Sequence, residues 1–435
     1  MKPNKRALII TYYWPPTGGS GVQRWVKFTK YIRRYGWEPI IYTPSNPEVP
    51  AIDTSLLKDI PEDITILKTP IWEPYSFYKK FVGIKKEEKL GAALMTSGNE
   101  NTFLQKLSIW VRGNLFIPDA RKFWIRPSVN FLKKYLKENP VDVIISTGPP
   151  HSMHMIGLKT SKITNIPWLA DFRDPWTNID FFEDLKLSKY ARERHHTLEK
   201  KALDNADKIL VISNTMKKEF LEITNSDITV IPNGFDSEDF IPIDYVPNPK
   251  CTISHIGMMT PTRNPKILWE VLNELSHEIE GFADNFKLQL VGRVDVSIQN
   301  DIRKFNLNNL VEIINYLPHD EVIPLQQKSE ALLLIINNSP NAALLLTGKL
   351  FEYLAAKRPI VCISPVFGDA TQLLNQSKSS TNILYSDKKG LKNQLVQIYS
   401  SWEKGINRFE ESNSDQYSRE SLTQTLVEQL NEISE

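Results

Sequence analysis

A lysine and a glutamate three positions apart stand at the start of a predicted helix. Lys349 and Glu352 lie in the segment GKLFEYLAAKRP, residues 348–359, which follows an apolar run at 331–336. Lys349 can neutralise a diphosphate, while the Glu352 carboxylate can accept both hydrogen bonds from a vicinal ribose diol. On a solvated helix face the same two residues would form an ion pair worth about 0.3–0.5 kcal/mol. Because they follow a buried strand, at the carboxyl edge of the predicted sheet, we favour the ligand-binding interpretation.

A second cation, Arg263, lies in the loop 257–265 between a predicted strand and a predicted helix. Asn264 is a good helix cap, and Pro265 suits the first helical position. An arginine near the start of its own helix is mildly disfavoured by the helix dipole, which makes a simple surface role the weaker alternative. We therefore expect Arg263 to project from the loop as a second cation for a departing phosphate.

Three glycines surround the start of the first predicted helix, at Gly18, Gly19 and Gly21, with Ser20 between them. Glycines let the backbone approach an anion, and the first turn of a helix offers free N–H groups and a positive dipole. A plain tight turn is the alternative, because a single glycine-rich loop is a weak signal. The second predicted strand ends without an acidic residue, so an enzyme that uses a nicotinamide dinucleotide is disfavoured.

Five polar residues follow two further predicted strands in the N-terminal half. They are His151, His154, Asp171, Arg173 and Asp174. At the carboxyl ends of parallel strands, such groups can hydrogen-bond sugar hydroxyls or orient an acceptor. Two alternatives stay open: the histidines can be packing residues, and the two acids can be satisfied by the arginine between them. No spacing of His, Cys or Asp indicates a metal site, so neither a metal ion nor a cofactor is expected.

Apolar, β-branched runs alternate with helix-period segments along most of the chain. These runs are apolar on both faces, which predicts parallel strands covered by helices in two doubly wound Rossmann-like α/β domains. Ligands in such folds bind at the carboxyl ends of the strands, here in a cleft between the domains. We expect an N-terminal domain at 1–235, a linker at 236–250, a C-terminal domain at 251–414 and a final helical segment at 415–435. The predicted strands are residues 7–13, 38–43, 141–147, 167–170, 208–213, 228–232, 251–257, 287–292, 310–315, 331–336 and 359–364, and the clearest helices are 22–35, 266–279 and 348–357.

The charge and cysteine content exclude several classes of protein. The 435 residues include 53 Lys and Arg against 51 Asp and Glu, a formal charge of +2, whereas nucleic-acid binding needs a basic surface. Cys251 and Cys362 stand far apart in apolar runs, which predicts buried thiols and a cytoplasmic protein. The N-terminus lacks the pattern of a signal peptide, and we find no apolar run of about 18 residues that could span a membrane.

One segment, at about 70–137, interrupts the alternation of strands and helices. It has an excess of eight positive charges and interleaved aromatic residues, among them Trp72, Phe123 and Trp124. Cations near an anionic leaflet gain about 1 kcal/mol each, and aromatic rings favour the headgroup region. A solvated basic helix over an aromatic core is an equal alternative. The segment is therefore a candidate for peripheral contact with the inner face of a membrane.

Four stretches, in matching order, resemble glycosyltransferase family 4: the glycine-rich first loop, VIPNGFD at 230–236, the Arg263 loop and GKLFEYLAAKRP. The resemblance implies a retaining, metal-independent enzyme with the GT-B fold and a nucleotide-sugar donor. It implies that Arg263 and Lys349 hold the donor diphosphate, that Glu352 binds the nucleotide ribose, and that the C-terminal helix braces the N-terminal domain. The further donor-site residues that it implies are Gly18, Gly19, Ser20, Gly21, Gly257, the backbone near Leu317, Thr347 and Gly348.

Two positions depart from the family pattern. Leu344 stands where the first Glu of a Glu-x7-Glu pair is expected, and Met258 stands where relatives often carry Arg. The resemblance implies transfer of a sugar from a nucleotide sugar to a saccharide or polyprenyl-linked saccharide in cell-surface polysaccharide synthesis. The departures keep open a catalytically weak or silent scaffold that binds nucleotide sugar or a partner enzyme. A sugar-nucleotide epimerase would need acids and bases that the sequence does not indicate.

Overall fold

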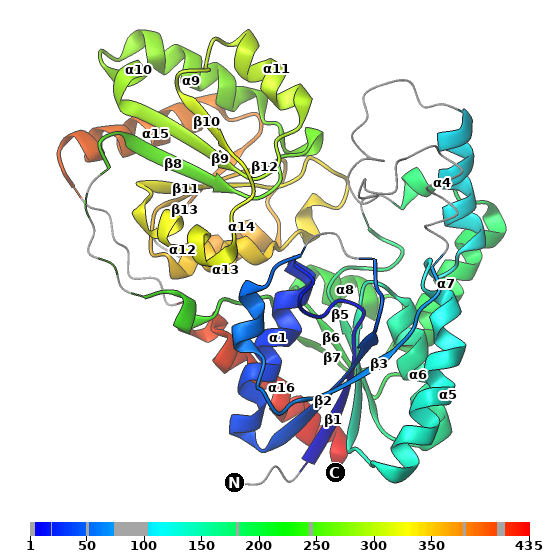
Figure 1. Cartoon of the computed structure of the whole chain (residues 1–435). Coiled ribbons are helices and arrows are strands. Elements are labelled where there is room, and N and C mark those ends of the chain that lie inside the picture. The colour runs from blue at the N-terminus through cyan, green and yellow to red at the C-terminus, as the bar shows by residue number, and fades with distance from the viewer. Residues whose placement is uncertain are drawn as a thin grey trace. The chain divides into compact units, whose positions relative to one another are not determined.

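Two α/β units make up the chain in the computed structural model. The N-terminal unit comprises Met1–Pro232 and Arg419–Glu435, and the C-terminal unit comprises Asn233–Ser418 (Figure 1). The structure describes residues 5–435 except 19, 49–51, 74–102, 180–181, 242, 244–245, 247, 377–379 and 407–413. The chain therefore leaves the N-terminal unit once, at Pro232, and returns to it with its last helix.

The N-terminal unit is built on a parallel sheet that winds outward in both directions from its first strand. Its described residues form seven strands in the order β3-β2-β1-β4-β5-β6-β7, and every neighbouring pair is parallel. β1 and β4 lie side by side at the centre, with Ala7 opposite Val143. The strands are β1 (Lys5–Ile10), β2 (Trp37–Pro44), β3 (Thr65–Thr69), β4 (Val143–Gly148), β5 (Trp168–Phe172), β6 (Lys208–Val211) and β7 (Ile228–Val230).

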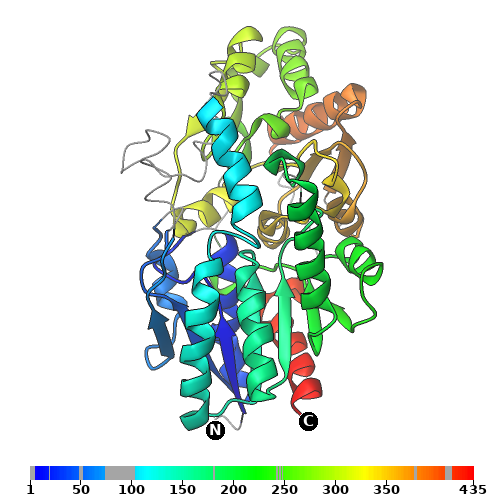
Figure 2. The same cartoon turned by 90° about the vertical axis from the view of Figure 1, so that its right-hand side faces the viewer.

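Helices cover both faces of this sheet because its central strands are apolar on both sides. α1 and α16 lie side by side on one face (Figure 1). Leu422, Leu426 and Leu430 of α16 join the same apolar core as Trp25 of α1. α5 and α6 run together on the other face (Figure 2). The helices of this unit are α1 (Ser20–Ile32), α4 (Phe103–Leu115), α5 (Lys122–Glu138), α6 (Ser152–Thr164), α7 (Lys189–Leu203), α8 (Asn214–Leu221) and α16 (Arg419–Ser434).

The C-terminal unit repeats the design with a smaller parallel sheet. Its described residues form six strands in the order β10-β9-β8-β11-β12-β13. Alternate residues of β11 face opposite cores: Leu333 packs with α9 and α15, and Leu334 packs with α13 and α14. The strands are β8 (Cys251–Ile256), β9 (Phe286–Val291), β10 (Val311–Ile314), β11 (Ala331–Ile335), β12 (Ile360–Ser364) and β13 (Ser380–Leu384), and the helices are α9 (Lys266–Glu278), α10 (Phe282–Asn285), α11 (Val296–Lys304), α12 (His319–Lys328), α13 (Gly348–Ala355), α14 (Asp369–Asn375) and α15 (Lys388–Glu403).

The predicted fold class, two doubly wound parallel α/β domains, is confirmed, with two strands added. β3 and β13 were not predicted from the sequence, and both are edge strands whose residues are mostly half-exposed. An edge strand faces water, so it lacks the continuous apolar run by which the central strands are identified.

Part of the basic segment at 70–137 belongs to the regular fold of the N-terminal unit and is not an insertion. Its last part is α5, whose Trp124 is buried and stacks on Tyr42 of β2 with ring centroids 4.9 Å apart. α5 is therefore an ordinary connecting helix of the sheet, in spite of its charged surface. Lys79, Lys80, Lys85, Lys86 and Lys89 lie outside the described residues, as does the side chain of Lys106.

Both cysteines are buried free thiols, Cys251 in the core beneath α9 and Cys362 in the core beneath α13. Among the residues that the structure places, no helix combines the length and the apolar character needed to cross a bilayer.

Candidate functional site

Lys349 occupies the second position of α13, and the main chain of Gly257, just beyond the end of β8, lies directly beneath its amino group. A Cβ atom added to Gly257 would lie 2.5 Å from Lys349 Nζ, and Gly257 has φ +115°, a conformation that favours glycine. Lys349 Nζ is inaccessible to water and has no hydrogen-bond partner among the described residues. A buried ammonium group without a partner is costly, so this arrangement is suited to an anion that supplies the missing acceptor.

Arg263 ends a short 3₁₀ turn at Pro261–Arg263, in the loop that follows β8. Its Nε donates a hydrogen bond to Asn337 Oδ1, and its Nη1 donates to the carbonyl oxygen of Met258 at 3.0 Å. Thr262 O accepts a hydrogen bond from Asn338 N at 2.7 Å, which ties this turn to the loop after β11. The guanidinium group is therefore held in place from two loops at the carboxyl edge of the sheet. Met258, one of the two departures from the family pattern, contributes through its backbone.

The two cations lie close enough to influence each other. Burial lowers the pKa of Lys349 to about 7, the positive charge of Arg263 acts in the same direction, and Glu352 acts against both. His255 of β8, which the sequence analysis did not single out, is also buried nearby. Burial lowers its pKa well below the usual value, and the charge of Lys349 lowers it further. An anion bound here would remove the repulsion, so the site favours a negatively charged ligand.

Glu352 lies one turn further along α13. Its Oε2 accepts a hydrogen bond from Gln326 Nε2 at 3.1 Å, and its Oε1 lies 4.0 Å from His319 Nδ1. Thr347, the residue before α13, makes no side-chain capping bond, and its buried Oγ1 has no hydrogen-bond partner in the described part of the chain. The space where a Cβ of Gly348 would lie is open. The start of α13 therefore offers free polar groups beside the two cations.

Leu317 and Leu344 complete the predicted positions of the C-terminal unit. Leu317 lies in the loop between β10 and α12, directly before Pro318 and the start of that helix. Leu344 is buried in a short 3₁₀ turn at Ala342–Leu344, so this position presents an apolar side chain where the family pattern has an acid.

The glycine-rich loop of the N-terminal unit is held by Arg173. Arg173 Nη1 donates to the carbonyl oxygen of Gly21 at 3.1 Å, and Nη2 donates to the carbonyl oxygen of Pro149. A Cβ on Gly21 would lie 2.5 Å from Arg173 Nη1, so a side chain at this position would displace the guanidinium group. Gly18 precedes α1, Ser20 begins it with a side chain outside the described residues, and Gly19 lies outside them altogether.

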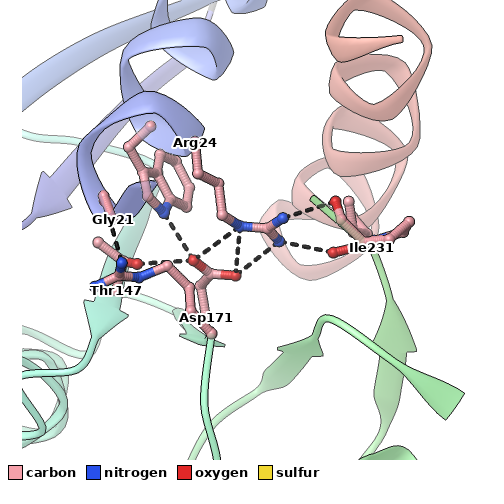
Figure 3. Close-up of polar contacts among 8 residues, drawn as sticks. Gly21, Arg24, Thr147, Asp171 and Ile231 are labelled. Carbon is pink, nitrogen blue, oxygen red and sulfur yellow. Dashed lines mark hydrogen bonds and ion pairs between the residues drawn. The ribbon is translucent and has the colours of Figure 1, made fainter. Parts of the chain in front are cut away.

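Asp171, predicted to face an acceptor, is instead enclosed within the N-terminal unit. Its carboxylate, 0% exposed, pairs with Arg24 at 2.9 Å and accepts hydrogen bonds from Trp25 Nε1 and Thr147 Oγ1 at 2.7 and 2.8 Å (Figure 3). Arg24 also donates to the carbonyl oxygens of Ile231 and Pro232. Burial raises the pKa of Asp171, but Arg24 and these hydrogen bonds outweigh it and hold the pKa below its ordinary value. The network joins α1, β4 and β5 to residues 231–232, where the chain leaves the N-terminal unit.

Arg24 was not proposed from the sequence, although it was detectable as a charge among the apolar residues of the first predicted helix. Asp171 thus forms its ion pair with Arg24, while its charge also raises the pKa of Arg173. Asp174 still interacts with Arg173, whose pKa burial lowers and the charge of Asp174 raises.

The two predicted acceptor-side histidines are packing residues. His154 is fully buried, stacks on Phe172 with centroids 4.0 Å apart, and its Nδ1 lies 2.9 Å from Ser146 Oγ. His151 stacks on Trp176 with centroids 4.5 Å apart. Burial lowers the pKa of His154 to about 3 and that of His151 well below its usual value. Both rings are therefore neutral, and the alternative left open by the sequence describes them better.

The geometry so far defines a class: a protein of two Rossmann-like units, of which the C-terminal one carries two neighbouring cations at the edge of its sheet. A family model described as "Glycosyltransferase Family 4" matches residues 93–239. The phosphatidylinositol N-acetylglucosaminyltransferase GPI3 subunit of Saccharomyces cerevisiae (strain YJM789) is 28% identical over 132 residues. That match spans 28% of this chain and 28% of the length of that relative.

Solved structures are similar over the whole chain. Sucrose-phosphate synthase from Thermosynechococcus elongatus is 12% identical with a TM-score of 0.65, covering 99% of both chains. The Anabaena protein HepE, solved with UDP and glucose, is 14% identical with a TM-score of 0.62, covering 99% of this chain and 100% of its own. These likenesses show the GT-B fold, and the match to the family model covers residues 93–239, less than half of the chain.

Proposed function

We propose that this protein is a retaining glycosyltransferase that moves a sugar from a nucleotide-sugar donor to a saccharide or lipid-linked saccharide acceptor in cell-surface polysaccharide synthesis. The observation that carries the proposal is the buried Nζ of Lys349, which has no partner in the described residues and lies near a second cation, Arg263. A leaving nucleoside diphosphate would supply the missing negative charge. The Anabaena neighbour, solved with UDP and glucose, supports a ligand of this class.

In the proposed reaction the bond between the anomeric carbon and the diphosphate oxygen breaks, and its electron pair remains on the diphosphate. The acceptor hydroxyl forms the new glycosidic bond on the same face of the sugar, and its proton leaves with the nucleoside diphosphate. Arg263 and Lys349 would stabilise the developing charge, and preorganised positive groups of this kind are usually the largest contribution to such chemistry. The part assigned to Gly18 and Gly21 stays a prediction from the sequence.

A catalytically silent scaffold remains the second candidate, favoured by one observation. Leu344 is buried and apolar at the position where the family pattern has an acid near the donor sugar. Incubation of the purified protein with UDP-, GDP- and ADP-sugars separates the two functions. Release of nucleoside diphosphate that depends on an added saccharide supports transfer, whereas saturable binding with no release under any acceptor supports the scaffold.

We also propose that the protein associates peripherally with the inner face of a membrane. A cluster of the exposed Trp72 and Phe123 with the partly exposed Phe116 and Lys122 supports this proposal, and we call it the aromatic–cation patch. Trp72 and Phe123 are 54% and 41% exposed, their ring centroids are 4.8 Å apart, and Lys122 Nζ lies 5.3 Å from the centroid of Phe123. Rings beside a cation suit an anionic headgroup layer.

Flotation with phosphatidylglycerol vesicles tests this association. We expect binding that weakens with salt and is reduced by Phe123→Ala, while Tyr190→Ala, at an exposed aromatic residue of α7, leaves it unchanged. Equal binding of both variants would contradict the role of the aromatic–cation patch.

A further inference from the structure

A histidine lies between two carboxylates at the start of α12. His319, the first residue of this helix, has Nε2 3.2 Å from Asp239 Oδ2 and Nδ1 4.0 Å from Glu352 Oε1. The three side chains are mostly buried, at 14%, 9% and 14% exposure. The other oxygen of Glu352 accepts the hydrogen bond from Gln326. Glu352 is therefore held by a hydrogen bond on Oε2, and its Oε1 lies within ion-pair distance of the imidazole ring.

The contact reaches back to the segment through which the chain enters the C-terminal unit. Asp239 ends a short 3₁₀ turn at Ser237–Asp239, close to the first residue of this unit, Asn233. His319 follows the loop that contains Leu317, and Glu352 belongs to α13. One imidazole ring thus connects three separate parts of the chain beside the cationic site.

A carboxylate that binds a vicinal diol must present both oxygens in a fixed orientation, but a glutamate side chain has three rotatable bonds. Holding it by neighbouring groups before the ligand arrives avoids the entropy cost of ordering it on binding. Imidazole suits this task because its two nitrogens can contact two partners at once, one of which fixes the orientation of the ring.

We propose that His319 and Asp239 are positioning residues that hold the Glu352 carboxylate for the ribose diol of a nucleoside diphosphate, and so determine discrimination between ribose and deoxyribose. The inference rests on the proposed function, since it takes a nucleotide as the ligand of this site. Asp239 orients the imidazole ring, the ring restrains Oε1 of Glu352, and Gln326 restrains Oε2.

Calorimetric titration with UDP, GDP and ADP, and with the 2′-deoxy form of each, tests this inference. The quantity of interest is the ratio of the affinities for the ribose and deoxyribose forms of one nucleotide. We expect Glu352→Ala to abolish the preference and His319→Gln to reduce it by about fivefold to tenfold, which corresponds to the loss of a polar contact worth about 1 kcal/mol. In the Glu352→Ala background, His319→Gln should change the ratio no further.

Two further variants make the outcome decisive. His277→Gln, at an exposed histidine of α9, is the matched control and should keep the full ratio. Asp239→Asn should reduce the ratio in the same direction as His319→Gln, and it replaces that variant if the latter does not fold. If these residues had only a structural role, the variants would bind the ribose and deoxyribose forms more weakly by the same factor and keep the ratio. A retained ratio would overturn this inference and leave the proposed function intact. If none of the three diphosphates binds the unsubstituted protein, the proposed function fails and the inference with it.

Discussion

The two units bury positive charge at the carboxyl edges of their sheets in opposite ways. In the N-terminal unit, Arg24 meets the carboxylate of Asp171 at 2.9 Å, both side chains are 0% exposed, and backbone carbonyls take further hydrogen bonds. In the C-terminal unit, Lys349 Nζ is buried with no acceptor among the described residues, and Arg263 adds repulsion. A buried ion pair with its hydrogen bonds satisfied holds loops together, whereas a buried amine without an acceptor favours the binding of an anion.

The largest effect is expected from breaking the satisfied pair. Asp171→Asn should lower the free energy of unfolding by about 3–5 kcal/mol, because it leaves Arg24 buried without a countercharge. Urea unfolding of the purified variant measures this loss. Asp227→Asn, at the 59% exposed partner of Lys208, is the control and should cost less than about 1 kcal/mol. Similar losses for both variants would show that burial does not determine how much an ion pair contributes to the free energy of unfolding.

The complementary change removes the unsatisfied cation. Lys349→Met should reduce turnover by about 10²–10³-fold, the usual cost of losing one preorganised group that stabilises developing charge. It should leave the free energy of unfolding unchanged or higher, since a buried amine without a partner destabilises the empty protein. Steady-state kinetics together with urea unfolding test both parts. Near-normal turnover, or a loss of stability as large as that of Asp171→Asn, would contradict the assignment of Lys349 to a ligand site.

Acid should affect the N-terminal unit through its buried histidines. The pKa of His154 is lowered by burial from 6.5 to about 3, while Asp171 opposes the shift and Arg173 adds to it. Between pH 6.5 and pH 3 the unfolded chain binds a proton at this residue that the folded unit does not bind. The free energy of unfolding should therefore fall by about 1.4 kcal/mol for each unit by which the pH is lowered in this range. His154→Gln should flatten this dependence, measured by urea unfolding at pH 4–7, whereas His277→Gln should not. An unchanged slope in His154→Gln would show that other groups dominate.

Alkali should affect the C-terminal unit through Lys349, with a pKa of about 7 in the ligand-free protein. Above that pH the amine is neutral and attracts a diphosphate less strongly. The affinity for UDP, GDP or ADP should therefore fall with rising pH, approaching tenfold per unit between pH 8 and 9. Titration calorimetry across this range measures the fall. Lys349→Arg keeps its charge at these pH values and should give a nearly constant affinity; a fall as steep as that of the unsubstituted protein would contradict the role of the amine.

The central strands and the Arg263, Lys349 and Glu352 positions were accessible from the sequence for a local reason. Continuous apolar runs such as 331–336 can only be buried on both faces, and polar groups placed just after them must lie near the carboxyl edge of a parallel sheet. The edge strands β3 and β13 could not be predicted in this way because water covers part of their surface. Trp124 was assigned to a basic insertion because charge on one face of α5 hid the aromatic contact on the other.

Local sequence thus specified the central strands and the polar residues that follow them, because periodicity and strand burial act within a few residues. The partners of the charged groups came from the folded chain. Arg24 and Asp171 are separated by 147 positions, and Asp239 and His319 by 80. No local pattern encodes a contact over such a distance, since packing of distant elements chooses which buried charge finds its counterion. The same packing leaves Lys349 Nζ without a hydrogen-bond partner among the residues that the structure describes, and this distinguishes the candidate site from the buried ion pair of the N-terminal unit.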